Sequence, residues 1–279
     1  MKTYLLLFLV TFSLIQSYGQ NSEEINYGSN LEKGKYVTIS ENQIYYETYG
    51  QGAPLLLIHG GLGSISNFMY SISDFSEHFK VIAMDSPGHG RSSHVDSLSY
   101  PYLAEIISQF IDNLKLDSLY ILGFSDGAVV GLQLAADRPD KVKKLFAIGA
   151  NIRLDALSES SISWMKNDMI EWAKNKDGWW SKNILPLMEQ PEKSDIFLKN
   201  TQKMWLTEVY VENSKIQSIK IPTMIMQGDK DGIKKEHAVE LSNYIENSQL
   251  CILPKTAHFV FGSKPKMVNQ IAIDFFNEK

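Results

Sequence analysis

Ser125 is the first residue whose surroundings indicate chemistry. It lies in the stretch GFSDG (123–127), directly after the apolar run LYIL (119–122). A strand that turns sharply into a helix holds the turn residue in a strained backbone conformation and leaves room only for small neighbours. Gly123 and Gly127 supply that space, and the serine hydroxyl is then exposed at the start of a helix. We therefore predict that Ser125 is a nucleophile; the alternative is a tight strand–helix turn without chemistry.

A serine hydroxyl is a weak nucleophile unless a neighbouring base takes its proton. His258 follows the last apolar run of the chain, and Asp231 follows the preceding run. Serine, acid and histidine occur in this chain order in enzymes that carry the serine on a strand-to-helix turn. Asp229 is the competing acid. It lies closer to the end of the strand, which favours a role in capping the turn, so Asp231 is the preferred partner of His258.

Acyl transfer also needs hydrogen-bond donors for a developing oxyanion. One predicted donor is the backbone N–H of Asp126, because unpaired amides at a helix N-terminus favour negative charge. The other is the N–H of Gly61 in the stretch HGGLGS (59–64), whose glycines let the loop approach a substrate. A plain tight turn is the alternative explanation of these glycines.

The remaining histidines and the only cysteine predict no further chemistry. His59 and His89 lie in glycine turns and are expected to make structural hydrogen bonds. The histidines in polar segments are expected to be solvated: His78, His94 and His237. No histidine pair has metal-ligand spacing with a nearby acid or thiol, so we predict no metal. Cys251 lies in an apolar run and is expected to be a buried, inert thiol without a disulfide.

The elements that position these residues follow from apolar runs that alternate with helical patterns. Two β-rich stretches, KYVTIS (35–40) and QIYYETYG (43–50), predict a hairpin after a loose polar leader at 20–34. The later runs predict βαβ units and a parallel sheet, in which ligands bind beyond the carboxyl ends of the strands. Residues 151–219 interrupt this alternation and contain all five tryptophans, which predicts a helical lid over the strand ends.

The first 19 residues have the layout of a secretory signal peptide, with Lys2 followed by an apolar stretch from Tyr4 to Ile15 and small residues at Ser17 and Gly19. The apolar stretch is short for a membrane span, which needs about 20 residues. We expect an exported chain, periplasmic or secreted, with no stable membrane insertion after cleavage; an uncleaved anchor is the alternative. The net charge of −5 and the absence of a basic run argue against a nucleic-acid partner.

Taken together, the motifs HGGLGS, DSPGHGRS, GFSDGA, GDKDG and TAHF occur in the order in which the α/β-hydrolase superfamily carries them, and the chain resembles that superfamily over nearly its whole mature length. The resemblance implies an α/β-hydrolase fold with a mostly parallel central sheet flanked by helices. It implies a core at 20–150 and 220–279 and a helical cap at 151–219. It also implies that Ser125 is the nucleophile, His258 the base and Asp231 the residue that orients it, with no cofactor.

Within the superfamily the chain looks most like the valacyclovir-hydrolase branch, alongside carboxylesterases and meta-cleavage-product hydrolases. That branch also carries an acid after the serine. The resemblance therefore suggests that the Asp126 side chain holds the ammonium of an amino-acid ester or a similar cation. The alternative is that Asp126 contributes only its amide and caps the helix. Phe124, where the branch tends to have tryptophan, is a second candidate substrate-binding residue.

The sequence thus predicts an exported serine hydrolase that cleaves a small-molecule ester through an acyl-enzyme. A carbon–carbon bond hydrolase and a proline-releasing aminopeptidase with the same three residues stay open. From a different class, a non-catalytic receptor that uses the cap pocket for a small ligand stays open too. The sequence does not indicate the oligomeric state.

Overall fold

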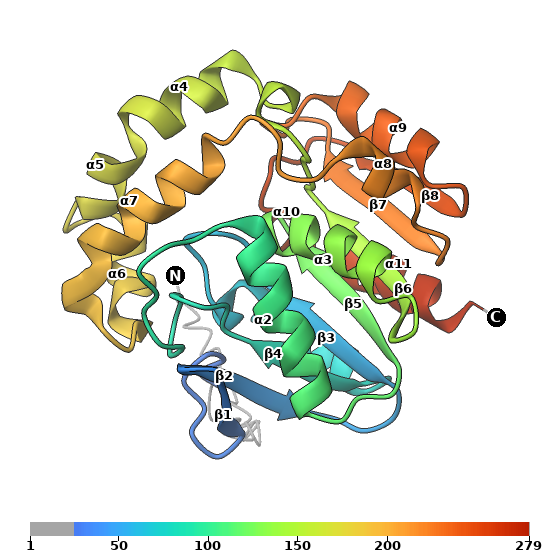
Figure 1. The fold of residues 1–279 in the computed structure, drawn as a ribbon, viewed down its shortest axis with the longest axis horizontal. Coiled ribbons are helices and arrows are strands. Elements are labelled where there is room, and N and C mark those ends of the chain that lie inside the picture. The colour runs from blue at the N-terminus through green and yellow to red at the C-terminus, as the bar shows by residue number, and fades with distance from the viewer. Residues whose placement is uncertain (1–24, 279) are drawn as a thin grey trace, which may run out of the picture.

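The computed structural model describes residues 25–278 (Figure 1). The predicted signal peptide at 1–19 lies outside this range. Among the helices that the structure describes, none combines the length and the apolar character needed to cross a membrane.

The described chain forms an eight-stranded sheet with the strand order β1-β2-β4-β3-β5-β6-β7-β8. The strands are β1 Gly34–Ile39, β2 Asn42–Tyr49, β3 Pro54–Ile58, β4 Lys80–Met84, β5 Leu119–Phe124, β6 Val142–Ile148, β7 Thr223–Gly228 and β8 Ser248–Leu253. The β1–β2 and β2–β4 pairs are antiparallel, and all later pairs are parallel. The predicted hairpin and the predicted mostly parallel sheet are therefore both confirmed.

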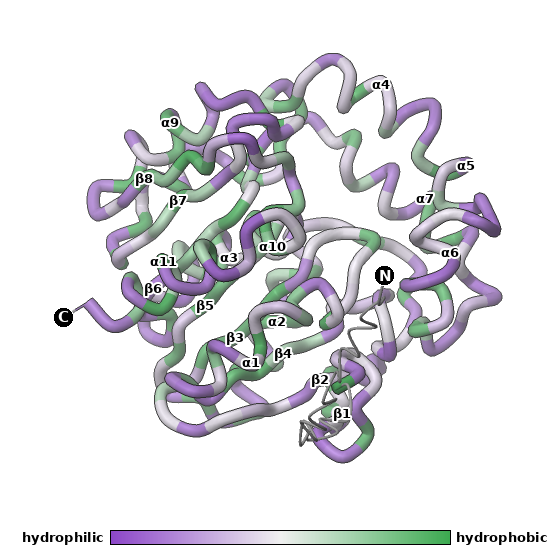
Figure 2. Tube along the Cα trace, turned by 180° about the vertical axis from the view of Figure 1, so that it is seen from behind, coloured by the Kyte–Doolittle hydropathy of each residue, from purple (hydrophilic) through white to green (hydrophobic). Residues whose placement is uncertain are grey.

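Strand β3 shows why the central strands are continuous apolar runs rather than alternating ones. Leu56 and Ile58 belong to a hydrophobic cluster on one face of the sheet, whereas Leu55 and Leu57 belong to the cluster on the other face. Successive side chains of a strand point to opposite faces, so a strand covered on both sides must be apolar at every position. Figure 2 shows hydrophobic residues gathered along the central strands.

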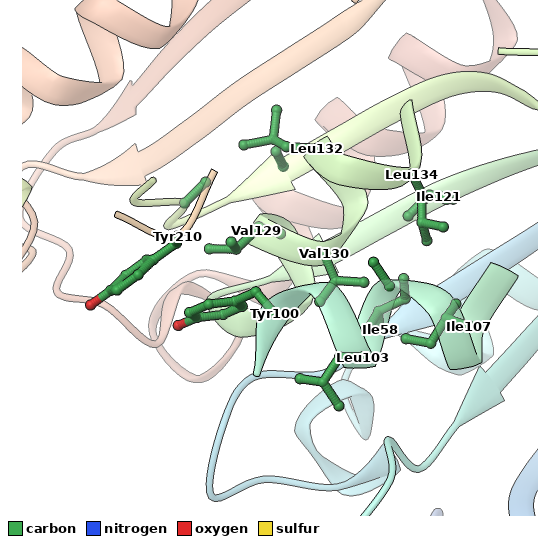
Figure 3. Close-up of a cluster of buried hydrophobic side chains, with 14 of the residues drawn as sticks. Ile58, Tyr100, Leu103, Ile107, Ile121, Val129, Val130, Leu132, Leu134 and Tyr210 are labelled. Atoms are coloured by element: carbon green, nitrogen blue, oxygen red, sulfur yellow. The ribbon is translucent and has the colours of Figure 1, made fainter. Parts of the chain in front are cut away.

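Helices cover both faces of this sheet. The first face is covered by α2 Tyr100–Asn113, α3 Asp126–Asp137, α8 Asn213–Gln217 and α9 Lys235–Tyr244. The second face is covered by α1 Ile72–Ser76, α10 Val260–Ser263 and α11 Pro265–Asn277. Figure 3 shows the first cluster, in which Leu103 and Ile107 of α2 lie beside Val130 of α3 and Ile58 of β3.

Four helices between β6 and β7 stand apart from the sheet (Figure 1). They are α4 Glu159–Asn167, α5 Met169–Lys174, α6 Trp179–Asn183 and α7 Ser194–Trp205. The predicted cap at 151–219 also includes α8, and that helix packs on the core: Ile216 is fully buried in the first cluster, and Lys215 forms an ion pair with Asp137 of α3. The segment that covers the strand ends is therefore α4 to α7.

The predicted loose leader is wrong over residues 26–30. The buried carboxylate of Glu47 in β2 accepts hydrogen bonds from the N–H groups of Gly28 and Asn30 and from the hydroxyls of Tyr45 and Tyr49. A buried carboxylate needs such donors, and the polar N-terminal segment supplies two of them. This segment is therefore part of the folded domain.

Two histidines predicted to be solvated are buried. His237 is 3% exposed because α9 turns it toward the sheet, where its Nε2 accepts the N–H of Ile152. The side chain of His94 is 5% exposed. Burial lowers the pKa of both. Cys251, predicted to be buried, is only half-buried because β8 is an edge strand, and partial burial raises the pKa of its thiol.

Candidate active site

Ser125 lies between the last residue of β5 and the first residue of α3, with φ 54° and ψ −118°. This positive φ is unfavourable for a residue with a side chain, so the turn is strained. The flanking glycines explain why it forms. A Cβ on Gly123 would collide with the backbone of Gly127, and a Cβ on Gly127 would collide with the carbonyl of Ile58. Strand and helix approach closely, and only glycine fits at both points.

Replacing Gly127 by alanine is expected to destabilise the protein by about 3 kcal/mol, because rigid backbone atoms cannot move away from the new methyl group. Gly131→Ala in the same helix is the matched control. Its Cβ would lie 2.8 Å from the flexible end of Leu145, and its cost should stay below about 1 kcal/mol since alanine favours a helix. Urea denaturation of the two variants measures the difference; equal losses would contradict the close approach.

Three predicted residues form one hydrogen-bonded row. The Ser125 Oγ lies 2.9 Å from the His258 Nε2, and the His258 Nδ1 lies 3.0 Å from each carboxylate oxygen of Asp231. His258 follows β8 and Asp231 follows β7, so the carboxyl ends of neighbouring parallel strands bring them together. The side chain of Asp231 is 1% exposed and also accepts the N–H of Ile233, which holds its orientation. A base oriented by an acid can take a proton from the serine.

Asp229 takes the other predicted role. Its carboxylate accepts the backbone N–H of Thr256 at 3.1 Å, and its own N–H donates to Leu253. These bonds join the ends of β7 and β8. Asp229 therefore supports the turn, and Asp231 is the acid that contacts His258.

Two opposing effects act on the imidazole of His258. Burial lowers its pKa, but the hydrogen bond that the ring donates to Asp231, the charge of Asp231 and the charge of Asp126 together outweigh burial and raise the pKa above the ordinary value of 6.5. A histidine with a raised pKa is a stronger base and holds a proton more readily after taking it from the serine.

Gly61 and Asp126 lie side by side next to the serine. A Cβ on Gly61 would collide with the Asp126 carboxylate and the Trp205 ring, which shows how closely the two residues approach. Within residues 25–278, neither the Gly61 N–H nor the Asp126 N–H donates to a protein acceptor. Both residues line the cavity that contains Ser125. The arrangement can supply two backbone donors to an oxyanion.

The loop that carries Gly61 is held by Asp85, which the sequence did not single out, and by the expected structural histidine His59. Asp85, fully buried after β4, accepts the N–H of Ile65 at 2.8 Å and the N–H of Arg91 at 2.8 Å. Burial raises the pKa of Asp85 to about 7. The Nε2 of His59 accepts the N–H of Ser86, as expected of a structural histidine. The signal for Asp85 was its position at the start of DSPGHGRS, directly after a strand.

The Asp126 side chain faces away from the helix end and into a polar cluster. Its carboxylate is 8% exposed and accepts the Tyr100 hydroxyl at 2.9 Å and the Trp205 indole N–H at 2.8 Å and 3.0 Å. Burial raises the pKa of Asp126, while these two donors and the charge of His258 oppose the rise. Tyr100 packs against Tyr210 with ring centres 4.6 Å apart (Figure 3). The cluster connects α7 of the cap segment to α2 and α3 of the core.

The sequence did not predict that Tyr100 and Trp205 contact Asp126 or that Tyr210 packs against Tyr100, because residue 100 and residues 205–210 belong to two distant segments. Phe124, predicted to bind substrate, is 5% exposed and lines the cavity. Its ring centre lies 5.1 Å from that of His258. Phe124 therefore supports the histidine as well as bordering the cavity. His89 is buried and contacts the carbonyl of Pro87, as expected of a structural residue.

The row opens into a cavity of about 660 Å³ between the strand ends and the helices α4 to α7. The carboxylate and imidazole side chains in its lining are those of Asp126, Asp231 and His258, and no lysine or arginine belongs to it. Among residues 25–278, no cluster of histidine, cysteine, aspartate or glutamate could hold a metal ion.

The sequence profile of the alpha/beta hydrolase fold matches residues 53–196. The chain is 24% identical to a 2-hydroxy-6-oxo-6-phenylhexa-2,4-dienoate hydrolase of Burkholderia cepacia, over 86% of this chain and 95% of the relative. It is 25% identical to an (E)-2-((N-methylformamido)methylene)succinate hydrolase of Acinetobacter baylyi, over 85% of this chain and 95% of the relative.

Among solved structures, a meta-cleavage product hydrolase from Pseudomonas fluorescens superposes with a TM-score of 0.72 at 21% identity. The match covers 89% of this chain and 99% of that one. At this identity the likeness shows a shared fold.

Proposed function

Because the chain belongs to the alpha/beta hydrolase fold family, we propose that it is a serine hydrolase that cleaves a small-molecule ester. One observation carries the proposal: the row Ser125–His258–Asp231 ends in a cavity beside two backbone N–H groups that have no acceptor within the described chain. Nucleophile, base, orienting acid and oxyanion donors are the full set that acyl transfer needs.

The reaction proceeds in two halves. The Ser125 Oγ attacks the ester carbonyl while the His258 Nε2 takes its proton, and the oxyanion accepts hydrogen bonds from the N–H groups of Gly61 and Asp126. The histidine then gives the proton to the leaving alkoxide, and an acyl-serine remains. Water repeats these steps with His258 as the base, which releases the acid and restores the serine. Asp231 stabilises the imidazolium that forms in each half.

The charge of the cavity favours a neutral or cationic substrate over the carboxylates that the relatives' names describe. A dienoate and a succinate are carboxylates, and a carboxylate binds most strongly beside a cationic side chain. This cavity has the Asp126 carboxylate and no lysine or arginine in its lining. An anionic substrate would be repelled, so we infer that the substrate is neutral or cationic. A carbon–carbon bond hydrolase is the second candidate function, because the chain is similar to hydrolases of dienoates. In that case too, the charge of the cavity favours a neutral substrate.

The direct test is labelling by a fluorophosphonate, which reacts only with an activated serine. We expect one adduct, located on Ser125 by mass spectrometry and absent from His258→Ala. Ser160→Ala is the matched control: Ser160 lines the same cavity outside the row, and its variant should still be labelled. A folded protein that remains unlabelled, yet binds a small ligand tightly, would overturn the proposal in favour of a receptor.

A labelled enzyme is then assayed with nitrophenyl esters of equal size that carry a neutral, an anionic or a cationic acyl group. We expect the anionic ester to be the poorest substrate, and Asp126→Asn to reduce that difference. A specific loss of cationic esters in Asp126→Asn would support the ammonium-binding role of this residue. Equal losses of kcat/KM for all three esters would show that the Asp126 side chain does not bind the ammonium. Its roles would then be the backbone N–H and the hydrogen bonds with Tyr100 and Trp205.

The pH dependence should report His258. The histidine acts as a base only when neutral, so kcat/KM should fall as the pH drops through its raised pKa, with the acid midpoint above 6.5. Asp126→Asn removes one of the charges that raise this pKa, and the acid midpoint should move to lower pH. Asp177→Asn, whose side chain is 92% exposed on the cap segment, is the control that should not shift. The same acid midpoint in the wild type, Asp126→Asn and Asp177→Asn would contradict the assignment of this midpoint to His258.

A further inference from the structure

The five tryptophans of the chain fall into two groups. Trp180 and Trp205 are buried, and their indole N–H groups are paired with the Leu62 carbonyl and the Asp126 carboxylate. The other three make no such side-chain hydrogen bond in the described chain, and they line the cavity together with Trp205: Trp164, Trp172 and Trp179. The first group joins the cap segment to the core through these hydrogen bonds.

Trp172 of α5 and Trp179 of α6 are the exposed members of the second group, at 41% and 52%. Neither ring belongs to the two hydrophobic clusters of the described chain. Trp172 contacts Trp164 edge-on, with ring centres 5.7 Å apart. Large aromatic surface in contact with water is unfavourable, and a patch that borders a binding cavity gains stability when an apolar ligand covers it.

The size and charge of the cavity agree with such a ligand. Its volume of about 660 Å³ falls in the range that holds drug-sized molecules and far exceeds what the acetyl group of a short ester fills. The carboxylate and imidazole side chains of the lining belong to Asp126 and to the row Ser125–His258–Asp231, so the tryptophan wall itself is uncharged. The cavity therefore has room for an extended apolar group that leads from Ser125 toward this wall.

We propose that Trp172 and Trp179 bind an extended apolar tail of the substrate, so that the enzyme prefers esters with a long alkyl chain. This inference rests on the proposed ester hydrolase function and specifies its substrate class. The tail belongs to the acyl or to the alcohol side of the ester, and the two sides are separated by the assay below.

The experiment compares kcat/KM for nitrophenyl acetate, butyrate and octanoate, and for ethyl and octyl acetate, in the wild type and in Trp172→Ala/Trp179→Ala. In one of the two series the wild type should prefer the long chain at least about tenfold, since each buried methylene contributes about fourfold. The double variant should lose about tenfold on that long ester and less than about twofold on the short one. Ile196→Ala on α7 is the matched control, because Ile196 is 48% exposed on the cap segment and does not line the cavity.

The outcomes separate the two proposals. Failure of every ester together with absence of the fluorophosphonate adduct would reject the hydrolase function itself. Turnover with equal effects on short and long esters would retain the hydrolase and reject the tail site. Should the double variant not fold, the single variants are used with octylboronic and ethylboronic acid as inhibitors. Each single variant is then expected to weaken the binding of octylboronic acid more than that of ethylboronic acid. An unchanged ratio of the two inhibition constants would reject the tail site.

Discussion

Replacing Ser125 by alanine is expected to lower kcat by about 10,000-fold or more, down to the turnover that the backbone donors alone provide. The Oγ is the only nucleophilic atom that lies within 2.9 Å of the His258 Nε2 in the described chain. No other hydroxyl of the described chain forms a hydrogen bond with this nitrogen, and the turn between β5 and α3 fixes the direction of residue 125. Turnover of a nitrophenyl ester by purified wild type and variant measures the effect. A variant that keeps more than about a tenth of the activity would show that Ser125 is not the nucleophile.

The same position should reveal a cost in stability. The φ of 54° is unfavourable for any residue with a Cβ, and glycine removes that strain. Ser125→Gly is therefore expected to be inactive but about 1 kcal/mol more stable than Ser125→Ala in urea denaturation. Lys115 also has φ 54° and lies outside the cavity, so Lys115→Gly is the control that keeps full turnover. Equal stability of the two Ser125 variants would show that the turn between β5 and α3 stores no strain.

Asp231→Asn is expected to lower kcat by about 10,000-fold, because an amide can donate to the His258 Nδ1 and thereby favour the wrong tautomer. In the wild type, both carboxylate oxygens of Asp231 lie 3.0 Å from the His258 Nδ1. Asp229→Asn is the matched control two residues away. Its amide oxygen can still accept the Thr256 N–H, so kcat should fall less than about tenfold.

Steady-state kinetics of the two variants, with thermal melting to verify the fold, decides between the two acids. A larger loss in Asp229→Asn than in Asp231→Asn would reverse the assignment. Loss of the fluorophosphonate adduct in Asp231→Asn, with the adduct retained in Asp229→Asn, would support Asp231 as the acid without the use of a substrate.

Much of the fold could be predicted from local patterns. The continuous apolar run of β3 indicates a strand covered on both faces, and the structure shows Leu55 and Leu56 in opposite clusters. Parallel strands place their carboxyl ends at one edge of the sheet, so residues that follow successive strands must converge. Ser125, Asp231 and His258 follow β5, β7 and β8, and their meeting was therefore predictable.

Predictions that depend on the environment of a side chain were less secure. His94 and His237 are surrounded by polar residues in the sequence but buried in the structure. His237 lies on α9, and polar neighbours along a helix do not show which face a residue occupies, because every third or fourth side chain points the same way. His94 lies in the loop between β4 and α2, where no sequence period predicts burial. The polar N-terminal segment at 26–30 looked unattached for a similar reason, since its partner Glu47 lies on β2.

The sequence by itself determined the type and order of the residues in the row Ser125–His258–Asp231, because the strand–turn–helix geometry at Ser125 depends on Gly123 and Gly127, two positions on either side. The tertiary structure decided which acid contacts His258, since Asp229 and Asp231 differ only in the direction that the turn gives them. It also decided that Trp205 and Tyr100 donate to Asp126, and that Trp172 and Trp179 face the cavity instead of the core. These contacts join segments far apart in the chain, and only the packing of the cap segment against the sheet brings them together.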